Sequence, residues 1–242
     1  MRLNSLAALY RKELFSSFFS PVFYGTGAFF LFFLSFRFYY LQSFLTMDSA
    51  SFRSFFSSFP LVYIFVIPAL TMKSWAEENK SGSAEILFTM PFTPWELCLG
   101  KFLSSFVLLL IYIFLTLPIP LSLLPLGNFD PGVIAAEYAG AVLLGAAAIA
   151  LGQFFSMLSR SQTAAFLSSV LVLLAFMFTD LLVSTLNLSP LISRCLNFFS
   201  LSFHFESFSR GLLDSRDFIF FILSAFLFLF LNTSVLIFRK WN

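Results

Sequence analysis

Six long stretches of the chain contain no charged residue. The longest has 28 residues and the shortest 19. They lie between residues 13 and 37, 53 and 73, 101 and 130, 137 and 160, 160 and 180, and 217 and 239. A helix needs about 20 apolar residues to cross the hydrocarbon core of a bilayer. The pattern therefore predicts six transmembrane helices, at residues 18–40, 57–76, 95–119, 133–158, 162–186 and 217–238.

The apolar residues in these stretches do not alternate with polar ones, as they would in the strands of a β-barrel. Only 11% of the chain is charged, against about 25% in a typical soluble domain. Phe alone occurs 39 times among 242 residues, which is more apolar surface than a soluble fold of this length can bury. The predicted fold class is therefore all-α, a polytopic membrane protein whose single domain covers residues 1–242.

Six crossings place both termini on the same side of the membrane. That side would hold nine of the Lys and Arg residues and the other side five, so the positive-inside rule favours cytoplasmic termini. Residues 1–17 have apolar positions at helical spacing, but Arg11, Lys12 and Glu13 interrupt the apolar core that a signal peptide needs. We expect these residues to form an interfacial helix, and segment 187–216 to be a long outer loop.

Residues suited to catalysis or metal binding are scarce. His204 is the only histidine, which excludes a metal site of the usual His-cluster spacing and argues against a Ser-His-Asp triad. The chain has no G-x-x-x-x-G-K-[ST] sequence, so ATP binding by a P-loop is excluded. A net charge of +2 gives no electrostatic basis for nucleic-acid binding. Cys98 and Cys195 are expected on opposite sides of the membrane, so no disulfide is expected between them.

Two further features leave alternatives open. Ala141 with Gly145, and Ala148 with Gly152, have the four-residue spacing that lets helices approach closely; the seam would join subunits or helices near a moving core, or reflect ordinary helix packing. Intramembrane carboxylates can mark a transport pathway. Glu137 and Asp180 lie near predicted helix ends, which favours solvated side chains over such a pathway.

The most charged part of the chain lies between the second and third predicted helices, in the loop at residues 77–94. Gly82 should break the preceding helix, because glycine readily adopts left-handed backbone angles. Ser83 can cap a second, short helix, with Glu85 in its first turn. The apolar residues of this helix share one face, and a proline ends it: Ile86, Leu87, Met90 and Pro91.

The third transmembrane helix has a strong start signal. Thr93 as N-cap, Pro94 at the first helical position and Glu96 as the third residue form a capping box. The short helix before it is amphipathic and would lie parallel to the membrane surface. Such a helix is a surface suited to a cytoplasmic partner.

This loop resembles a known motif. "SWAEENKSGSAEILFTMPFTPWELCLGKFL" is similar to the first cytoplasmic loop of type-2 ABC-transporter permeases. Asn79 stands where those proteins commonly have a basic residue, and Lys80 follows it. "HFESFSRGLLDSRDFIFFILSAFLFLFL" is similar to the segment before the last helix in the gliding-motility and nitrous-oxide-reductase-maturation branch of that family. The resemblance covers essentially the whole chain.

The resemblance implies a membrane subunit without catalytic activity, in the inner membrane of a bacterium. Residues 1–17 would be an elbow helix, and residues 83–89 a coupling helix that contacts one of two separate cytoplasmic ATPase subunits. A second permease copy or a related permease would complete the membrane part, in contact with lipid. The chain itself would bind no cofactor, since ATP and Mg would bind to the ATPase. The expected ATPase-coupling residues are Glu77, Glu78, Lys80, Gly82, Ser83, Glu85, Ile86, Leu87, Met90 and Pro91.

The expected function is therefore that of a permease in an ABC exporter. An alternative is the membrane component of an ATP-driven mechanical or envelope-assembly machine that moves no substrate. An intramembrane protease of the prenyl-endopeptidase type fits less well. Those enzymes begin their site with Glu-Glu, as in Glu77 and Glu78, but place Arg four residues later, where Gly82 stands here, and supply several His.

The outer segment 187–216 has its own pattern. Its apolar residues 191–199 predict a re-entrant or interfacial helix, and charged residues follow before the last transmembrane helix. The segment would be an outer gate, or a fixed plug in which Arg–Asp pairs satisfy buried ends. The candidate residues for a gate are His204, Glu206, Arg210, Asp214, Arg216 and Asp217.

Overall fold

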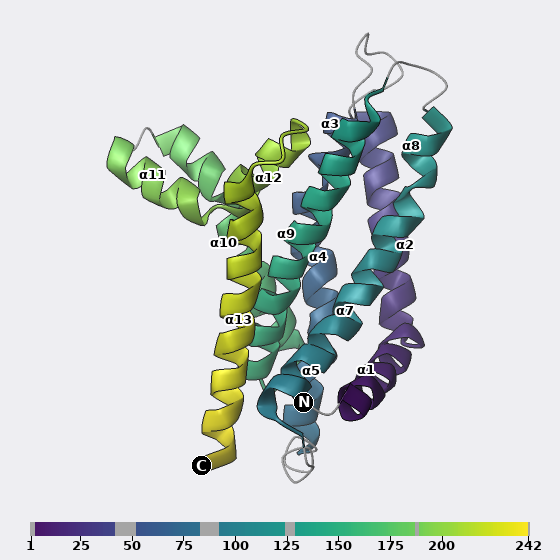
Figure 1. Ribbon diagram of the computed structural model, residues 1–242, viewed down its shortest axis with the longest axis vertical. Helices are drawn as coiled ribbons and strands as arrows, with labels where there is room; N and C mark the ends of the chain where they lie inside the picture. Colours follow the sequence, from purple (N-terminus) through teal and green to yellow (C-terminus); the bar gives the residue numbers. More distant parts are fainter. Residues whose placement is uncertain (1–2, 42–51, 83–91, 124–128, 187–188, 242) are drawn as a thin grey trace.

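The structure of the chain is a computed structural model that describes residues 3–41, 52–82, 92–123, 129–186 and 189–241 (Figure 1). All regular elements in these ranges are helical. They are α1 (Leu3–Phe18), α2 (Pro21–Phe36), the π-helical η1 (Arg37–Leu41), α3 (Arg53–Phe56), α4 (Phe59–Thr71), α5 (Lys73–Ser81), α7 (Pro94–Thr116), α8 (Pro118–Leu123), α9 (Pro131–Leu158), α10 (Gln162–Leu186), α11 (Pro190–Phe199), α12 (Leu201–Ser209) and α13 (Ser215–Trp241).

Six stretches of helix are long and apolar enough to cross a membrane, which confirms the predicted number within the described ranges. They are Pro21–Tyr40, Arg53–Ser81, Pro94–Leu123, Pro131–Leu158, Gln162–Thr179 and Ser215–Arg239. The chain is therefore a multi-pass, all-α membrane protein. The start of α1 and the end of α13 lie at the same end of the bundle, together with α5 (Figure 1); we call this the α5 end, and the opposite end the α12 end.

Prolines account for most differences between predicted and observed helix ends. The first spanning helix begins at Pro21 rather than at residue 18, because a residue that precedes proline is disfavoured in the helical region. The third was expected to bend but continue to residue 119. The spanning stretch breaks between Thr116, the end of α7, and Pro118, the start of α8, which agrees with the expected bend, and it continues to Leu123; the break occurs there because proline cannot donate the hydrogen bond that would continue the helix. The fifth, at 162–186, was predicted correctly.

The second spanning helix differs most from the prediction of 57–76. It begins at Arg53 with α3 and continues through α4 and α5 to Ser81. The join between α4 and α5 is at Met72. Pro68 lies within α4, one turn before this join. As a result, the polar residues of α5 extend the helix beyond its apolar part at the α5 end.

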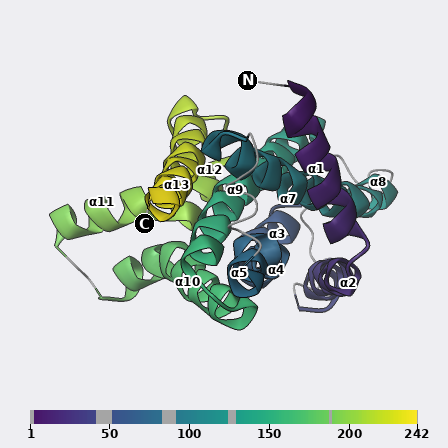
Figure 2. The same cartoon turned by 90° about the horizontal axis from the view of Figure 1, so that it is seen from below.

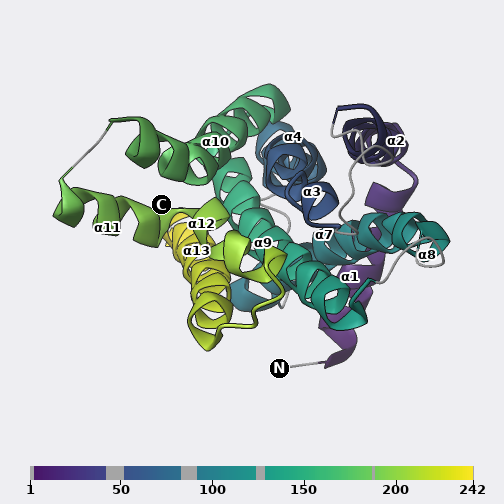
Figure 3. The same ribbon diagram turned by 90° about the horizontal axis from the view of Figure 1, so that it is seen from above.

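Helix α9 is the centre of the bundle and contacts α4, α5, α7, α10, α12 and α13. Figures 2 and 3, viewed along the bundle, show α9 surrounded by these helices, with α2 outside α4 and α7. Ala141 and Ala148 are fully buried. A Cβ atom at Gly145 would overlap Leu109 of α7. The seam of small residues thus joins helices within one chain.

The segment at 187–216, which was expected to be an outer loop, has two helices in its described part, α11 and α12, where one apolar helix was expected. A helix over the apolar residues 190–199 is confirmed. Helix α11 projects from the side of the bundle near the α12 end (Figure 1). Its residues Leu191, Phe198 and Phe199 are exposed. Cys195 on this helix is an exposed free thiol, and Cys98 is a buried one.

Candidate functional site

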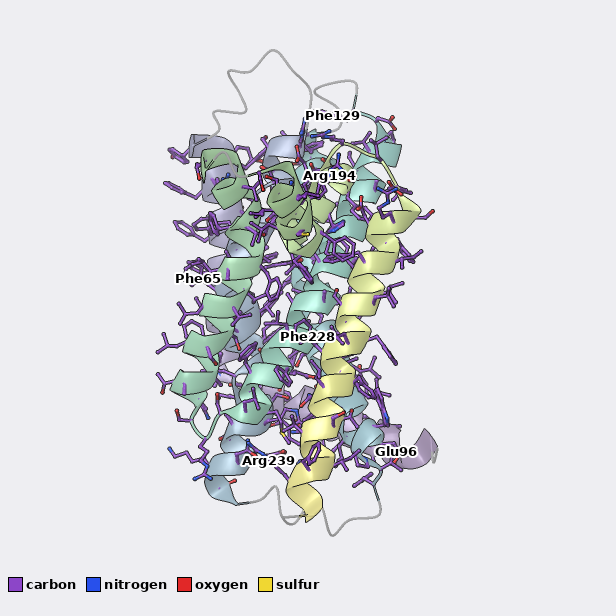
Figure 4. The ribbon with its side chains drawn as sticks, turned by 90° about the vertical axis from the view of Figure 1, so that its left-hand side faces the viewer. Phe65, Glu96, Phe129, Arg194, Phe228 and Arg239 are labelled. Atoms are coloured by element: carbon purple, nitrogen blue, oxygen red, sulfur yellow. The ribbon has the colours of Figure 1, made fainter. Side chains whose placement is uncertain are left out.

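A buried cation at the α5 end joins three helices. Helix α7 starts with the predicted capping box: the Thr93 hydroxyl accepts from the backbone N–H of Glu96, whose carboxylate accepts from the backbone N–H of Thr93. Glu96 lies at the lower end of the bundle in Figure 4. About one and a half turns further along α7, the side chain of Lys101 is only 1% exposed. The capped helix start therefore places one cation inside the protein.

The Lys101 ammonium has partners on two other helices. It donates to the carbonyl oxygen of Ser74 at 2.7 Å and to the Glu78 carboxylate at 2.8 Å, both on α5. Its nitrogen is 3.4 Å from the Glu13 carboxylate of α1, and 4.8 Å from the centre of the Trp75 ring. Lys101, Glu13, Glu78, Ser74 and Trp75 are here called the Lys101 cluster.

The charges of the Lys101 cluster explain its burial. A buried ammonium loses several kcal/mol of hydration, so it needs both charge partners and hydrogen bonds. Two carboxylates face one ammonium, and Lys12, whose side chain is 65% exposed, lies 3.5 Å from Glu13. The two cations and two anions are therefore balanced. The cluster fixes α1 and α5 to the start of α7 by electrostatics that only the correct arrangement of the three helices satisfies.

A second contact holds α5 to α9. Helix α4 ends and α5 begins at Met72. The hydroxyl of Ser156, on α9, accepts from the N–H groups of Trp75 and Ala76 at 3.1 and 3.2 Å. The same hydroxyl donates to the carbonyl oxygen of Met72 at 3.0 Å. One serine thus satisfies three backbone groups at this break.

Asn79 makes the reciprocal contact at the end of α9. Its amide nitrogen donates to the carbonyl oxygens of Met157 and Ser159, at 3.0 and 3.1 Å. These carbonyls belong to the last turn of α9 and to its C-cap, where helical partners are missing. A basic residue was expected at this position from the motif; an asparagine here caps the central helix instead.

The loop that was expected to contact an ATPase follows α5, and most of it lies outside the described residues. Gly82 ends α5 with a φ of 71°, which confirms the predicted break. Of the predicted coupling residues, Glu77 and Lys80 are exposed, and Glu78 belongs to the Lys101 cluster. The others lie outside the described residues: Ser83, Glu85, Ile86, Leu87, Met90 and Pro91.

The outer gate candidates form three separate groups. His204 and Asp217 are both buried, with the Nδ1 atom of His204 2.6 Å from the Asp217 carboxylate. The Nε2 atom of His204 lies 3.1 Å from the carbonyl oxygen of Phe198, and its ring stacks on Phe220 at 3.9 Å between centroids. This pair joins α12 to the start of α13 and also contacts the end of α11.

The remaining candidates are exposed, except Glu206, which is half-buried. The Glu206 carboxylate accepts from Arg210 at 2.6 Å and from Arg53 of α3 at 3.3 Å. The Asp214 carboxylate accepts from the backbone N–H of Arg216. A plug held by Arg–Asp side-chain pairs was one of two alternatives for this segment; within the described residues the pairs are different, since arginines pair with Glu206 and Asp217 pairs with His204. The cause is helical spacing, since Glu206 and Arg210 are four residues apart on α12.

Glu137 differs from the sequence prediction. A solvated carboxylate was favoured there because the residue lies near a helix end, but its side chain is fully buried. Neither carboxylate oxygen has a hydrogen-bond partner among the described residues. The cause is α12, which covers this part of α9: Gly140, less than one turn away, contacts Phe208. The side chain of Asp180, the other carboxylate in question, lies outside the described residues.

A groove of about 640 Å³ opens on the side of the bundle. We call it the lateral groove. Residues of α9 form its floor, α10 and α13 form its two walls, and α11 lies across its α12 end. Figure 4 is viewed from this side and shows Phe228 between the two walls. Phe and Leu predominate in its lining, where Arg216 is the only Lys or Arg.

Sequence reasoning did not single out Lys101 or Ser156 as site residues, although it noted Lys101 within the motif. A lysine that follows an amphipathic loop by several residues, inside an apolar helix, is a usable signal of a buried pair. Ser156 gave no signal, because many serines occur in these helices. Within the described residues, no group of three or more His, Cys, Asp or Glu could hold a metal ion.

Comparison with known proteins adds no relative. No protein-family model matches the chain, and no curated protein matches it significantly. A function for the chain therefore has to be argued from the Lys101 cluster, the helices that it joins and the resemblance of the loop beside it.

Proposed function

We propose that the chain is the permease subunit of an ABC transporter, with the α5 end in the cytoplasm, and that a separate ATPase docks there. The observation that carries this proposal is the Lys101 cluster. It joins α1, α5 and α7 at the point where segment 83–91 leaves and re-enters the described part of the chain. A force applied to that segment would act on three helices together rather than on one.

The central helix extends this argument. Ser156 and Asn79 join α5 to the end of α9, and α9 contacts α10, α12 and α13. A displacement of α5 would therefore reach the helix on which most of the bundle packs. In this proposal α1 acts as the elbow helix, segment 83–89 as the coupling helix, and substrate moves outward across a bacterial inner membrane.

The first test is co-purification from the native membrane, with ATP hydrolysis as the readout. We expect an ATPase to co-purify with the wild-type chain and to be lost with Leu87→Asp, which places a charge on the apolar face of the proposed coupling helix. Leu223→Asp in α13 is not a suitable control, because Leu223 lines the lateral groove. Ser81→Asp, an exposed position in α5, is the matched control.

Glu77 offers a second, cleaner variant than Glu78. Glu77 is exposed, whereas Glu78 also holds the Lys101 cluster together. Glu77→Lys should lower ATPase binding while the thermal stability of the isolated chain stays unchanged. The proposal would be wrong if no ATPase accompanies the wild-type chain in any detergent that keeps it monodisperse, or if Leu87→Asp leaves co-purification and stimulated hydrolysis unaltered.

A further inference from the structure

The lateral groove has the form of a lipid site. Its walls, α10 and α13, carry exposed Leu and Phe side chains on their outer faces, as expected of helices that contact acyl chains. The lining continues this apolar surface inward to Ala147 and Leu151 on α9, the central helix. A groove of about 640 Å³ is within the size range of binding sites for small organic molecules. An apolar ligand can therefore enter from the membrane without crossing water.

The length of the groove matches an acyl chain that starts at the membrane surface. On α13 the lining extends from Arg216 to Phe230. At 1.5 Å per residue these positions are about 21 Å apart along the helix. One leaflet contributes about 15 Å of hydrocarbon, half of a core that is about 30 Å thick. With Arg216 at the interface, the groove covers the depth of one leaflet.

Charge decides which lipid fits. Arg216 is exposed, and within the described part of the chain its guanidinium makes no ion pair with a carboxylate. No Asp or Glu lines the groove. The other ionisable side chain there, His204, is engaged with Asp217. An anionic phosphate group would therefore meet one free guanidinium, which binds phosphate oxygens in a forked geometry.

We propose that the lateral groove binds one acyl chain of an anionic phospholipid, with Arg216 bound to the lipid phosphate. The site lies beside α9 and under α11, so an occupied groove would fill the space between α10 and α13 (Figures 3 and 4). This binding does not depend on an ATPase, and it can be tested on the chain alone.

The test is native mass spectrometry of the purified chain, titrated with palmitoyl-oleoyl-phosphatidylglycerol and with the phosphatidylcholine of the same acyl chains. We expect one tightly retained phosphatidylglycerol. Arg216→Gln should weaken its binding about tenfold and should weaken phosphatidylcholine less, because the choline cation of that lipid already opposes the guanidinium. Arg37→Gln removes the same charge from the other side of the bundle and should change neither affinity.

The acyl-chain part of the site needs its own variant. Ser224 lines the groove and is half-buried, so Ser224→Trp should fill it and abolish tight binding of both lipids. Ser234, on the same helix with the same kind of bond from its hydroxyl to the preceding turn, does not line the groove, and Ser234→Trp is the control. Thermal unfolding of each variant shows that it is folded.

Three results would overturn the proposal. Retained phosphatidylglycerol in Ser224→Trp would place the lipid elsewhere, and an unchanged affinity in Arg216→Gln would remove Arg216 from the site. A dimer of the wild-type chain that dissociates with Ser224→Trp, without any retained lipid, would show that a second copy covers the groove. Each result is independent of whether an ATPase co-purifies.

Discussion

The Lys101 ammonium donates to the Glu78 carboxylate at 2.8 Å, between two membrane-spanning helices that follow one another in the chain. Both side chains are largely removed from water, at 1% and 14% exposure. In such surroundings each charge depends on the other, because neither can recover its hydration. The pair is therefore better suited to hold α5 against α7 than to exchange partners at a surface.

Lys101→Met should lower the stability of the chain by about 3 kcal/mol, because it leaves the carboxylates of Glu13 and Glu78 without their shared cation. The measurement is the midpoint of thermal unfolding in detergent. Adding Glu78→Gln to Lys101→Met should recover part of the loss. Lys12→Met, at an exposed position beside Glu13, should cost less than about 0.5 kcal/mol. Equal midpoints for Lys101→Met and Lys12→Met would show that the cluster contributes no stability.

Ser156→Ala should destabilise the join between α4 and α5. The substitution removes the hydroxyl that accepts from the backbone N–H groups of Trp75 and Ala76 and donates to the carbonyl oxygen of Met72. Each buried group that loses its partner costs about 1–3 kcal/mol. Faster amide hydrogen exchange in residues 72–78 would report this loss locally. Ser168→Ala removes a hydroxyl that bonds only within its own helix and should leave the exchange of that segment unchanged.

Gly152→Ala and Gly25→Ala should shift stability in opposite directions. A Cβ at Gly152 would overlap the Thr71 side chain of α4, so α4 and α9 would have to move apart, at a cost of about 1–3 kcal/mol. Gly25 in α2 has open space around it, where alanine should add up to about 1 kcal/mol through helix propensity. Thermal unfolding of both variants under one condition compares them. A neutral Gly152→Ala would mean that the close contact is not required.

The parts of the fold that the sequence predicted are those set by local chemistry. The six spans follow from runs without charge, and the start of α7 follows from Thr93, Pro94 and Glu96, whose bonds form within a few residues of chain. Gly82 ends α5 for a similar local reason. Each of these predictions can be made without knowing which helices pack together.

The site residues that the sequence missed depend on contacts between distant segments. Ser156 meets α5 from about 80 residues away in the chain, and no spacing within α9 indicates it. The burial of Glu137 arises from α12, which follows it by more than 60 residues. The position of Glu137 near a helix end suggested a solvated side chain. Local position does not show that a helix distant in the sequence packs over the residue.

Glu137 and Gln153 allow a matched exchange on the central helix. Both side chains are fully buried in α9, and neither has a hydrogen-bond partner for its terminal atoms among the described residues. Glu137→Gln replaces a carboxyl group by an amide of the same shape and should raise stability by about 1 kcal/mol, because a buried carboxyl without a partner must either keep its charge or take up a proton from solvent, and the amide does neither.

Gln153→Glu makes the reverse change and should lower stability by about 3 kcal/mol, because the new carboxyl in the core must either stay charged without a partner or take up a proton from solvent. A change of 1 kcal/mol moves the midpoint of unfolding by about 2–4 °C in domains of 150–250 residues, so the two variants should differ clearly. A lower midpoint for Glu137→Gln would contradict the expectation. It would show that the carboxylate gains more from charges at the α12 end, where α3 carries Arg53 against α9, than burial costs it.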